Sequence, residues 1–159
     1  MKKRFVPDMV ISDISQLKAE LLHEKNIKLL LFDIDNTLVL HGKDATKETL
    51  SYVKSFKDAG IIPCFISNNS KKRVDKFNEN INVFAISNAK KPLKKAYLDI
   101  MKKYDMPKEN TAILGDQIFS DIWGGNAVGI YTIWVNGEKG KEPFFIKPKR
   151  WLENKLMGK

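Results

Sequence analysis

The sequence predicts a doubly wound α/β domain built on a parallel sheet. Apolar segments typical of buried strands alternate with helical segments of roughly 10–15 residues, which is the pattern of consecutive βαβ units. With 159 residues, 43% of them hydrophobic, the chain is long enough for one core and too short for two ordinary domains. We therefore expect a single domain over 1–159, with a core of about 27–135, an appended N-terminal helix and a basic C-terminal tail.

The elements follow in order along the chain. Residues 13–24 carry apolar side chains at helical spacing and predict an amphipathic helix before the sheet. Residues 27–33 form a nearly continuous apolar run that ends in an acid, which indicates a central parallel strand. The remaining predicted strands are 61–67, 83–87, 111–115 and 130–135, and the predicted helices between them are 46–59, 70–78, 92–104 and 119–128.

The alternation of strands and helices stops after Val135. A polar loop follows, and residues 144–159 mix aromatic with basic side chains. Trp151, Leu152 and Leu156 fit one apolar stripe, which predicts a terminal helix around 148–157 that docks on the domain. Binding of this segment to a membrane surface or to a partner is the alternative.

Composition limits the classes of function. No apolar run reaches the roughly 20 residues of a membrane span, so we expect a cytoplasmic protein that contacts a membrane at most from its inner surface. The net charge of +9 would attract nucleic acid, anionic lipid or phosphorylated ligands, and it also fits a solubility charge. Cys64 is the only cysteine, which excludes an intramolecular disulfide, and its apolar neighbours predict a buried side chain.

Polar residues follow several of the predicted strands. In an open α/β sheet, ligands bind outside the carboxyl ends of the strands, so residues at these ends can converge although they are distant in sequence. The residues concerned are Asp33 with Asp35, Ser67 with Asn68, and Asp116 followed by Asp121.

Asp33 and Asp35 stand one residue apart at the mouth of the first predicted strand. Two ionised groups leaving an apolar strand are costly to bury without partners, and a cation is the natural partner. Magnesium prefers oxygen ligands and is usually held by one or two carboxylates together with phosphate and water. The strand context and the spacing exclude a calcium-binding EF-hand loop.

Four sequence elements carry a resemblance to a known family. They are Asp33-x-Asp35-x-Thr37, Ser67, Lys91-Pro92 and Gly115-Asp116-x-x-x-x-Asp121. In this order they resemble the four motifs of the haloacid dehalogenase (HAD) superfamily, and the match extends over about 27–135. The amino-acid sequence of residues 32–38 and 66–69 is most similar to that of the YqeG branch of the subclass IIIA phosphatases.

The resemblance implies a HAD-like Rossmannoid fold and a magnesium-dependent phosphatase. Asp33 would attack phosphorus and form an aspartyl-phosphate, which splits one difficult displacement into two. Asp35 would protonate the leaving alkoxide, later activate water, and lend its backbone carbonyl to magnesium. Ser67 and Asn68 would bind the phosphate.

The family's lysine would stabilise the charge of the nucleophile and of the transferring group. Lys90 and Lys91 compete for this role. Lys91 is preferred because the family's lysine commonly stands directly before a proline, as Lys91 stands before Pro92.

The resemblance also assigns supporting roles. Asp116 would complete the metal site formed with Asp33 and Asp35, and Asp121 would support it through water or from outside the ligand shell. Thr37 would shape the loop by local hydrogen bonds.

The spacing of the motifs leaves no room for a cap. Cap domains of the superfamily are inserted after the first motif or between the second and third, and here residues 38–66 and 68–90 separate these motifs. A helix and a strand account for most of each segment. An uncapped site cannot seal a small metabolite from water by domain closure, which favours a phosphate carried by a bulky or surface-presented molecule.

The YqeG branch resembles the phosphatidylglycerophosphate phosphatases of mitochondria, which makes a lipid phosphate the expected substrate. Basic segments at 2–4 and 147–150 fit a peripheral contact with an anionic membrane. The same charge would suit binding to RNA or the ribosome. A soluble sugar or nucleotide phosphatase, with a cap supplied by another subunit of an oligomer, is a third reading.

Overall fold

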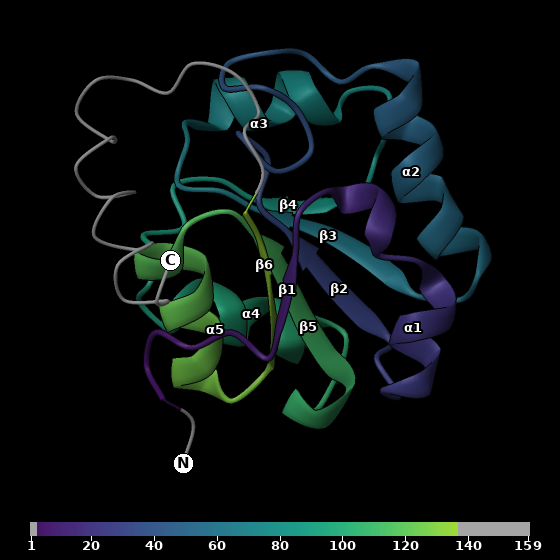
Figure 1. Cartoon of the computed structure of the whole chain (residues 1–159). Helices are drawn as coiled ribbons and strands as arrows, with labels where there is room; N and C mark the ends of the chain where they lie inside the picture. Colours follow the sequence, from purple (N-terminus) through teal and green to yellow (C-terminus); the bar gives the residue numbers. More distant parts are fainter. Residues whose placement is uncertain (1–2, 137–159) are drawn as a thin grey trace.

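Strand β2 (Leu29–Phe32) is the centre of the fold because all four of its side chains are apolar and fully buried. The computed structural model describes residues 3–136 and places β2 between two other strands of a six-stranded parallel sheet (Figure 1). A strand that is paired on both edges and covered on both faces has no side in water, so its sequence is a continuous apolar run. The prediction of a doubly wound parallel sheet is confirmed.

The strands lie side by side in the order β1-β6-β5-β2-β3-β4. In chain order they are β1 (Met9–Ile11), β2, β3 (Ile62–Ile66), β4 (Phe84–Ile86), β5 (Thr111–Gly115) and β6 (Tyr131–Val135). The helices are α1 (Ala19–Glu24), α2 (Lys47–Asp58), α3 (Lys71–Asn78), α4 (Lys95–Lys103) and α5 (Trp123–Val128). Three short helical segments are η1 (Ile14–Gln16), η2 (Lys108–Asn110) and η3 (Ile118–Ile122).

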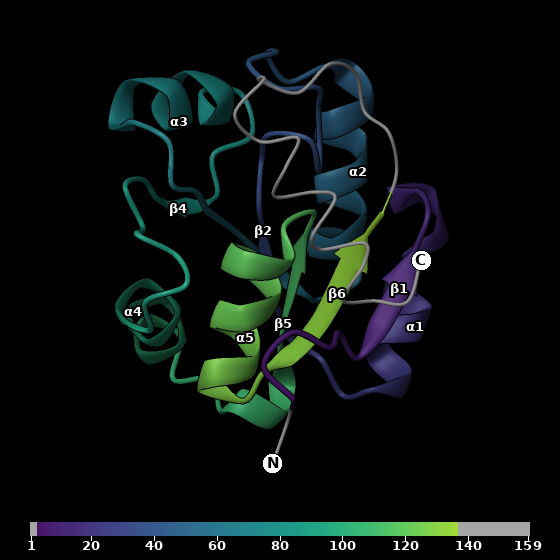
Figure 2. The same ribbon diagram turned by 60° about the vertical axis from the view of Figure 1, so that its left-hand side comes forward.

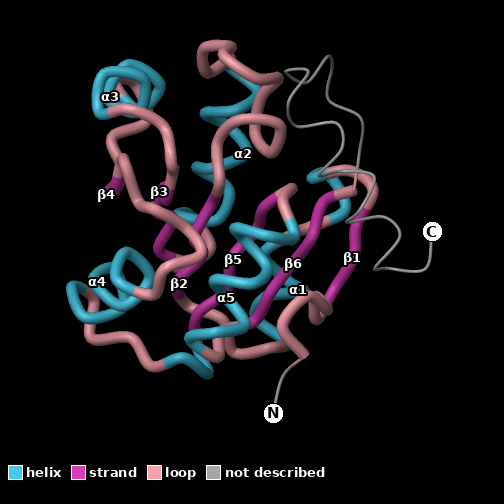
Figure 3. Tube along the Cα trace, turned by 90° about the vertical axis from the view of Figure 1, so that its left-hand side faces the viewer, coloured by secondary structure: helices cyan, strands magenta, loops and turns pink. Residues whose placement is uncertain are grey.

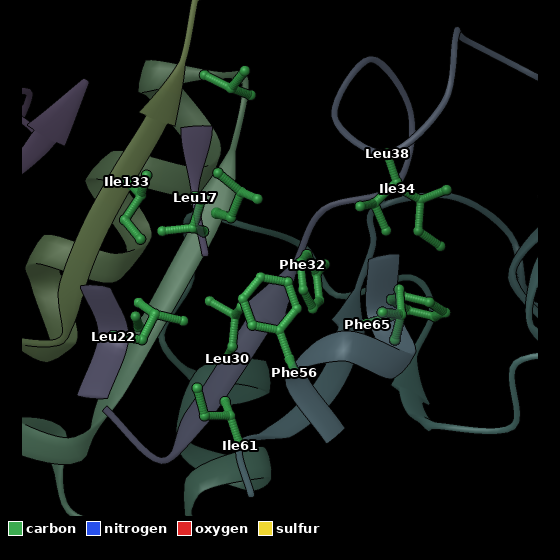
Figure 4. Packing of buried hydrophobic residues seen from close by; sticks show 14 of the residues in the cluster. Leu17, Leu22, Leu30, Phe32, Ile34, Leu38, Phe56, Ile61, Phe65 and Ile133 are labelled. Carbon is green, nitrogen blue, oxygen red and sulfur yellow. The ribbon is translucent and has the colours of Figure 1, made fainter. Parts of the chain in front are cut away.

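Helices cover both faces of the sheet because successive side chains of a strand point to opposite faces. Leu30 and Phe32 belong to a core that α1, α2 and α3 cover, and Figure 4 shows Phe32 packed with Phe56 of α2 in this core. Leu29 and Leu31 belong to a second core on the other face, which α4 covers. Helix α5 also lies on the face of α4, as Figures 2 and 3 show.

The parallel arrangement brings the carboxyl ends of the strands to one edge of the sheet. Phe32 of β2 pairs with Phe65 of β3 and Leu114 of β5, so the residues that follow these strands are neighbours in space. Helix α2 connects β2 to β3, and α3 connects β3 to β4. Within residues 3–136, neither connection contains an inserted cap domain.

Strand β1 (Met9–Ile11) was not predicted from the sequence. It extends the sheet at one edge by pairing with β6 in parallel, with Met9 beside Ile133. Just before it, Asp8 and Thr132 are joined by two hydrogen bonds of 2.9 Å, one between backbones from Asp8 N to Thr132 O and one from Thr132 N to the side-chain Oδ2 of Asp8. Three residues are too short to show an alternation, so tertiary contacts rather than local pattern form this strand.

The prediction of one helix over 13–24 is wrong. The segment forms η1, then an extended stretch at Leu17 and Lys18, then α1. The Tyr52 hydroxyl donates to the carbonyl oxygens of Ile14 at 2.8 Å and Leu17 at 3.3 Å. Leu17 and Leu22, two of the apolar residues on which the helix was predicted, are nevertheless both buried.

Two predicted helices differ from the structure near the carboxyl edge of the sheet. The helix expected over 92–104 begins at Lys95, because the chain before it forms a turn in which Leu93 N donates to Lys90 O at 2.9 Å. The helix expected over 119–128 opens with the π-helical turn η3 before α5. π-helical turns are rare in proteins overall, but those that occur often lie at functional sites.

The predicted helix around 148–157 and the basic C-terminal tail lie outside the described residues. Among residues 3–136, every helix is too short or too polar to cross a membrane.

Cys64 provides a test of this packing. Its side chain is fully buried in β3, and burial raises the pKa of the thiol to about 12, against the opposing effects of Tyr104 and Lys103. Only the thiolate reacts with disulfide reagents, and at pH 8 it is about one part in 10⁴ of the thiol. We expect no labelling of the native protein by a chromogenic disulfide reagent over an hour, and one thiol per chain labelled at once in denaturant. Labelling of the native protein within minutes would contradict the packing.

Candidate active site

Three carboxylates gather at the carboxyl edge of the sheet. Asp33 follows β2 directly and Asp116 follows β5, while Asp121 comes from η3. One carboxylate oxygen from each lies within 4.8 Å of the others. The buried Thr37 hydroxyl bridges two of them, donating to Asp33 Oδ2 at 3.3 Å or to Asp116 Oδ1 at 3.4 Å. Thr37 therefore contacts the acids themselves, beyond the local loop bonds expected for it.

Lys91 lies between two of these carboxylates. Its ammonium nitrogen is 3.0 Å from Asp33 Oδ1 and 2.6 Å from Asp121 Oδ1, and its side chain is 2% exposed. The Asn68 side chain holds the Lys91 backbone, because Oδ1 accepts from Lys91 N at 2.7 Å and Nδ2 donates to Lys91 O at 3.4 Å. Lys90 is exposed. The structure thus brings Lys91, and not Lys90, to the acids.

Asp121 occupies the space beside Gly115. A Cβ at Gly115 would lie 2.3 Å from the Asp121 carboxyl carbon, so only glycine leaves room for this carboxylate. Its Oδ2 accepts from Gln117 N at 3.2 Å, while Oδ1 accepts from Lys91. Asp121 therefore contacts Lys91 directly, where the sequence led us to expect a more distant supporting position.

The cluster carries excess negative charge. Burial disfavours the charged form of Lys91, but the carboxylates of Asp121 and Asp33 outweigh it and raise the pKa of Lys91. Burial and the charge of Asp33 raise the pKa of Asp121 to about 6, against the attraction of Lys91, so both groups are charged at neutral pH. Among the residues that the structure describes, the carboxyl groups of Asp33, Asp116 and Asp121 thus gather around the one ammonium group of Lys91. A divalent cation would neutralise the excess, and carboxylate oxygens fit the preference of Mg²⁺.

A cavity of about 380 Å³ opens over the cluster. Asp33, Ser67, Asn68 and Lys91 are among the residues that line it. Ser67 follows β3, is buried, and accepts a hydrogen bond at Oγ from Asn69 N at 3.0 Å. This bond leaves the Ser67 hydroxyl hydrogen free to donate to a ligand.

Asp35 lines the same cavity but has its own set of partners. Oδ1 accepts from Arg73 Nη2 at 2.8 Å and from Gly42 N at 2.7 Å, and Oδ2 accepts from Asn69 Nδ2 at 3.2 Å. Burial alone would raise the pKa of Asp35, but the hydrogen bonds from Arg73, Gly42 and Asn69 together lower it below its usual value. Asp35 is therefore a carboxylate at neutral pH.

Sequence reasoning did not single out Arg73 or Asn69. Arg73 stands among lysines in a polar helix, where a solvated charge is the ordinary interpretation. Asn69 completes the Ser-Asn-Asn run after β3, but nothing local indicates that its side chain reaches Asp35. The one available signal is the rarity of arginine, which appears at 4, 73 and 150 among 28 basic residues.

Comparisons with known proteins show the family to which the chain belongs. The sequence model of the family described as mitochondrial PGP phosphatase matches residues 1–138. The chain is 32% identical over 158 residues to the protein named "Probable phosphatase YqeG" of Bacillus subtilis (strain 168), which covers 99% of this chain and 92% of that protein.

Two solved structures share the fold. A structure assigned to the HAD superfamily, subfamily III A, from Legionella pneumophila matches with a TM-score of 0.60 and 22% identity, over 75% of this chain and 71% of that one. The 3-deoxy-D-manno-octulosonate 8-phosphate phosphatase of Moraxella catarrhalis, in complex with magnesium, phosphate and KDO, matches with a TM-score of 0.53 and 18% identity, over 71% and 80%. The chain thus belongs to the mitochondrial PGP phosphatase family, a family of phosphoric monoester hydrolases with the HAD fold.

Proposed function

We propose that this chain is a magnesium-dependent phosphatase that hydrolyses a phosphate monoester through an aspartyl-phosphate on Asp33. The observation that carries the proposal is the Lys91 ammonium group held between Asp33 and Asp121, beside Asp116, in the wall of an open cavity. Carboxylates that are removed from water need positive charge nearby, and a bound phosphate ester would add further negative charge that a cation must neutralise.

Magnesium would be held by the carboxylates of Asp33 and Asp116 and by the backbone carbonyl of Asp35, with Asp121 in a supporting position. When bound, the ion supplies positive charge for the phosphoryl oxygens. The choice of magnesium is supported by the Moraxella catarrhalis phosphatase, whose structure contains magnesium and phosphate.

The chain's own residues would divide the reaction into two steps. Asp33 attacks phosphorus, and the bond to the leaving oxygen breaks with its electron pair going to that oxygen. Because Asp35 is ionised in the structure, the leaving oxygen would take its proton from water, and not from Asp35 as the family resemblance implied. Lys91 and the Ser67 hydroxyl stabilise the charge on the transferring group. In the second step water attacks the aspartyl-phosphate, Asp35 takes a proton from that water, and the carboxylate of Asp33 is released.

A phosphate on a bulky or lipid carrier, such as phosphatidylglycerophosphate, is the substrate we favour. The family description supports a lipid phosphate. The absence of an inserted cap within residues 3–136 supports a substrate whose bulk stays outside the cavity.

Asp33→Asn tests the nucleophile. The amide keeps the shape of the side chain and removes the attacking oxygen anion, so release of phosphate from p-nitrophenyl phosphate should fall by at least about 10³-fold. Chelation with EDTA should abolish the wild-type activity, and millimolar Mg²⁺ should restore it. Turnover that survives in Asp33→Asn, measured by phosphate release with an unchanged circular dichroism spectrum as control, would contradict the assignment.

Lys91→Met tests the buried charge arrangement. Removal of the ammonium group leaves the buried carboxylate of Asp121 and the largely buried carboxylate of Asp33 without their shared counter-charge, so the free energy of unfolding in metal-free buffer should fall by about 3–5 kcal/mol. Millimolar Mg²⁺ should restore part of the loss. The matched control is Lys90→Met, which removes an exposed charge from the preceding residue and should leave stability within about 0.5 kcal/mol of wild type in urea titrations. Equal effects of the two substitutions would contradict the arrangement.

A substrate panel tests the carrier of the phosphate. Phosphatidylglycerophosphate in mixed micelles should be hydrolysed with a kcat/KM at least about tenfold above that of soluble sugar phosphates, and Asp33→Asn should hydrolyse neither. Efficient turnover of sugar phosphates without lipid activity would replace the lipid by a soluble substrate.

A further inference from the structure

Arg73 connects three parts of the structure around the cavity. It lies in the first turn of α3, and its side chain is 14% exposed. Nη2 donates to Asp35 Oδ1 at 2.8 Å and to the Lys43 carbonyl at 2.6 Å. The guanidinium carbon lies over the Phe77 ring, 5.4 Å from its centre.

Arg73 is the main partner that holds the Asp35 carboxylate in place. Arg73, Gly42 N and Asn69 Nδ2 are its three donors, and only Arg73 among them carries a charge. Asp35 and Asn69 line the cavity, but Arg73 is not among the lining residues. Arg73 therefore holds Asp35 from behind and leaves one side of the carboxylate toward the cavity.

The same guanidinium group holds the loop 36–44. Arg73 binds the carbonyl of Lys43, and Asp35 binds the neighbouring N–H of Gly42. His41, next to this point, lines the cavity and donates its backbone N–H to Asn36 Oδ1 at 3.1 Å. The part of the cavity wall that Asn36 and His41 form is thus held in place by the Asp35–Arg73 pair.

We propose that Arg73 is a positioning residue for the second step of the reaction, the hydrolysis of the aspartyl-phosphate. The inference rests on the proposed function, in which Asp35 takes a proton from the attacking water. In that step the water oxygen bonds to phosphorus, the bond from phosphorus to Asp33 breaks, and the electron pair returns to the Asp33 carboxylate. A carboxylate held by three donors has a fixed direction, which is what the acceptor of this proton requires.

This role makes a specific kinetic prediction for Arg73→Gln. With p-nitrophenyl phosphate, whose leaving group needs little protonation, kcat/KM reports formation of the aspartyl-phosphate and should change less than about threefold. Hydrolysis should slow, so kcat should fall by roughly 10²-fold, within the range of a general base, and KM should fall with it. The phosphorylated enzyme should accumulate and be detected by mass spectrometry after rapid acid quenching.

Two variants control this experiment. Lys72→Gln removes the same charge from the preceding, exposed residue of α3, and it should behave as wild type. Arg73→Lys keeps the charge without the planar two-donor group, so it should recover only part of kcat. If thermal unfolding shows that Arg73→Gln does not fold, Arg73→Lys carries the same test, with a smaller fall in kcat at an unchanged kcat/KM.

The outcomes separate the two proposals. If wild type forms no phosphorylated enzyme and Asp33→Asn retains activity, the proposed function fails. If wild type is active as proposed but Arg73→Gln matches Lys72→Gln, or loses kcat and kcat/KM equally without phosphorylated enzyme, the positioning role of Arg73 is overturned.

Discussion

The ammonium group of Lys91, buried between Asp33 and Asp121, is the interaction on which the arrangement of the site depends. A buried ammonium ion is stable only with close counter-charges, so the three chain segments that carry these residues must meet. Each segment has a local feature that allows this. Asn68 clamps the backbone of Lys91, and Gly115 leaves the space that the Asp121 carboxylate fills.

The same arrangement limits what the site can bind. Lys91 alone cannot attract a phosphate dianion, since its charge is already shared by two carboxylates and a third, Asp116, lies beside them. A divalent cation would change the balance, because it would neutralise the excess acid and leave Lys91 and Ser67 to face the phosphoryl oxygens. The binding of metal and the binding of phosphate would therefore be coupled, because Lys91 without the metal does not supply enough positive charge for a phosphate.

Much of the fold could be predicted because its strands are buried on both faces, which gives continuous apolar runs such as Leu29–Phe32. That Asp33 and Asp116 could converge followed from the parallel topology, and the family resemblance assigned both to the metal site. What could not be predicted depends on contacts distant in sequence. Strand β1 is formed by its pairing with β6. In the segment before β2, the Tyr52 hydroxyl donates to the carbonyl oxygens of Ile14 and Leu17, where the predicted helix is interrupted. Arg73 stands among lysines in the sequence, and the rarity of arginine does not indicate that its side chain contacts Asp35 and the Lys43 carbonyl.

Two carboxylates of one loop, Asp33 and Asp35, thus have different surroundings although a single residue separates them. Asp33 shares Lys91 with Asp121, while Asp35 is paired with Arg73. Distinct partners allow two like groups the distinct roles that we propose for them, Asp33 as the nucleophile and Asp35 as the proton acceptor. Within residues 3–136, the side chains that these proposed roles require are held in place by contacts between helices, strands and loops. The bond from Arg73 to the Lys43 carbonyl is such a contact, since it ties the loop 36–44 to α3 at the point where Asp35 meets the cavity.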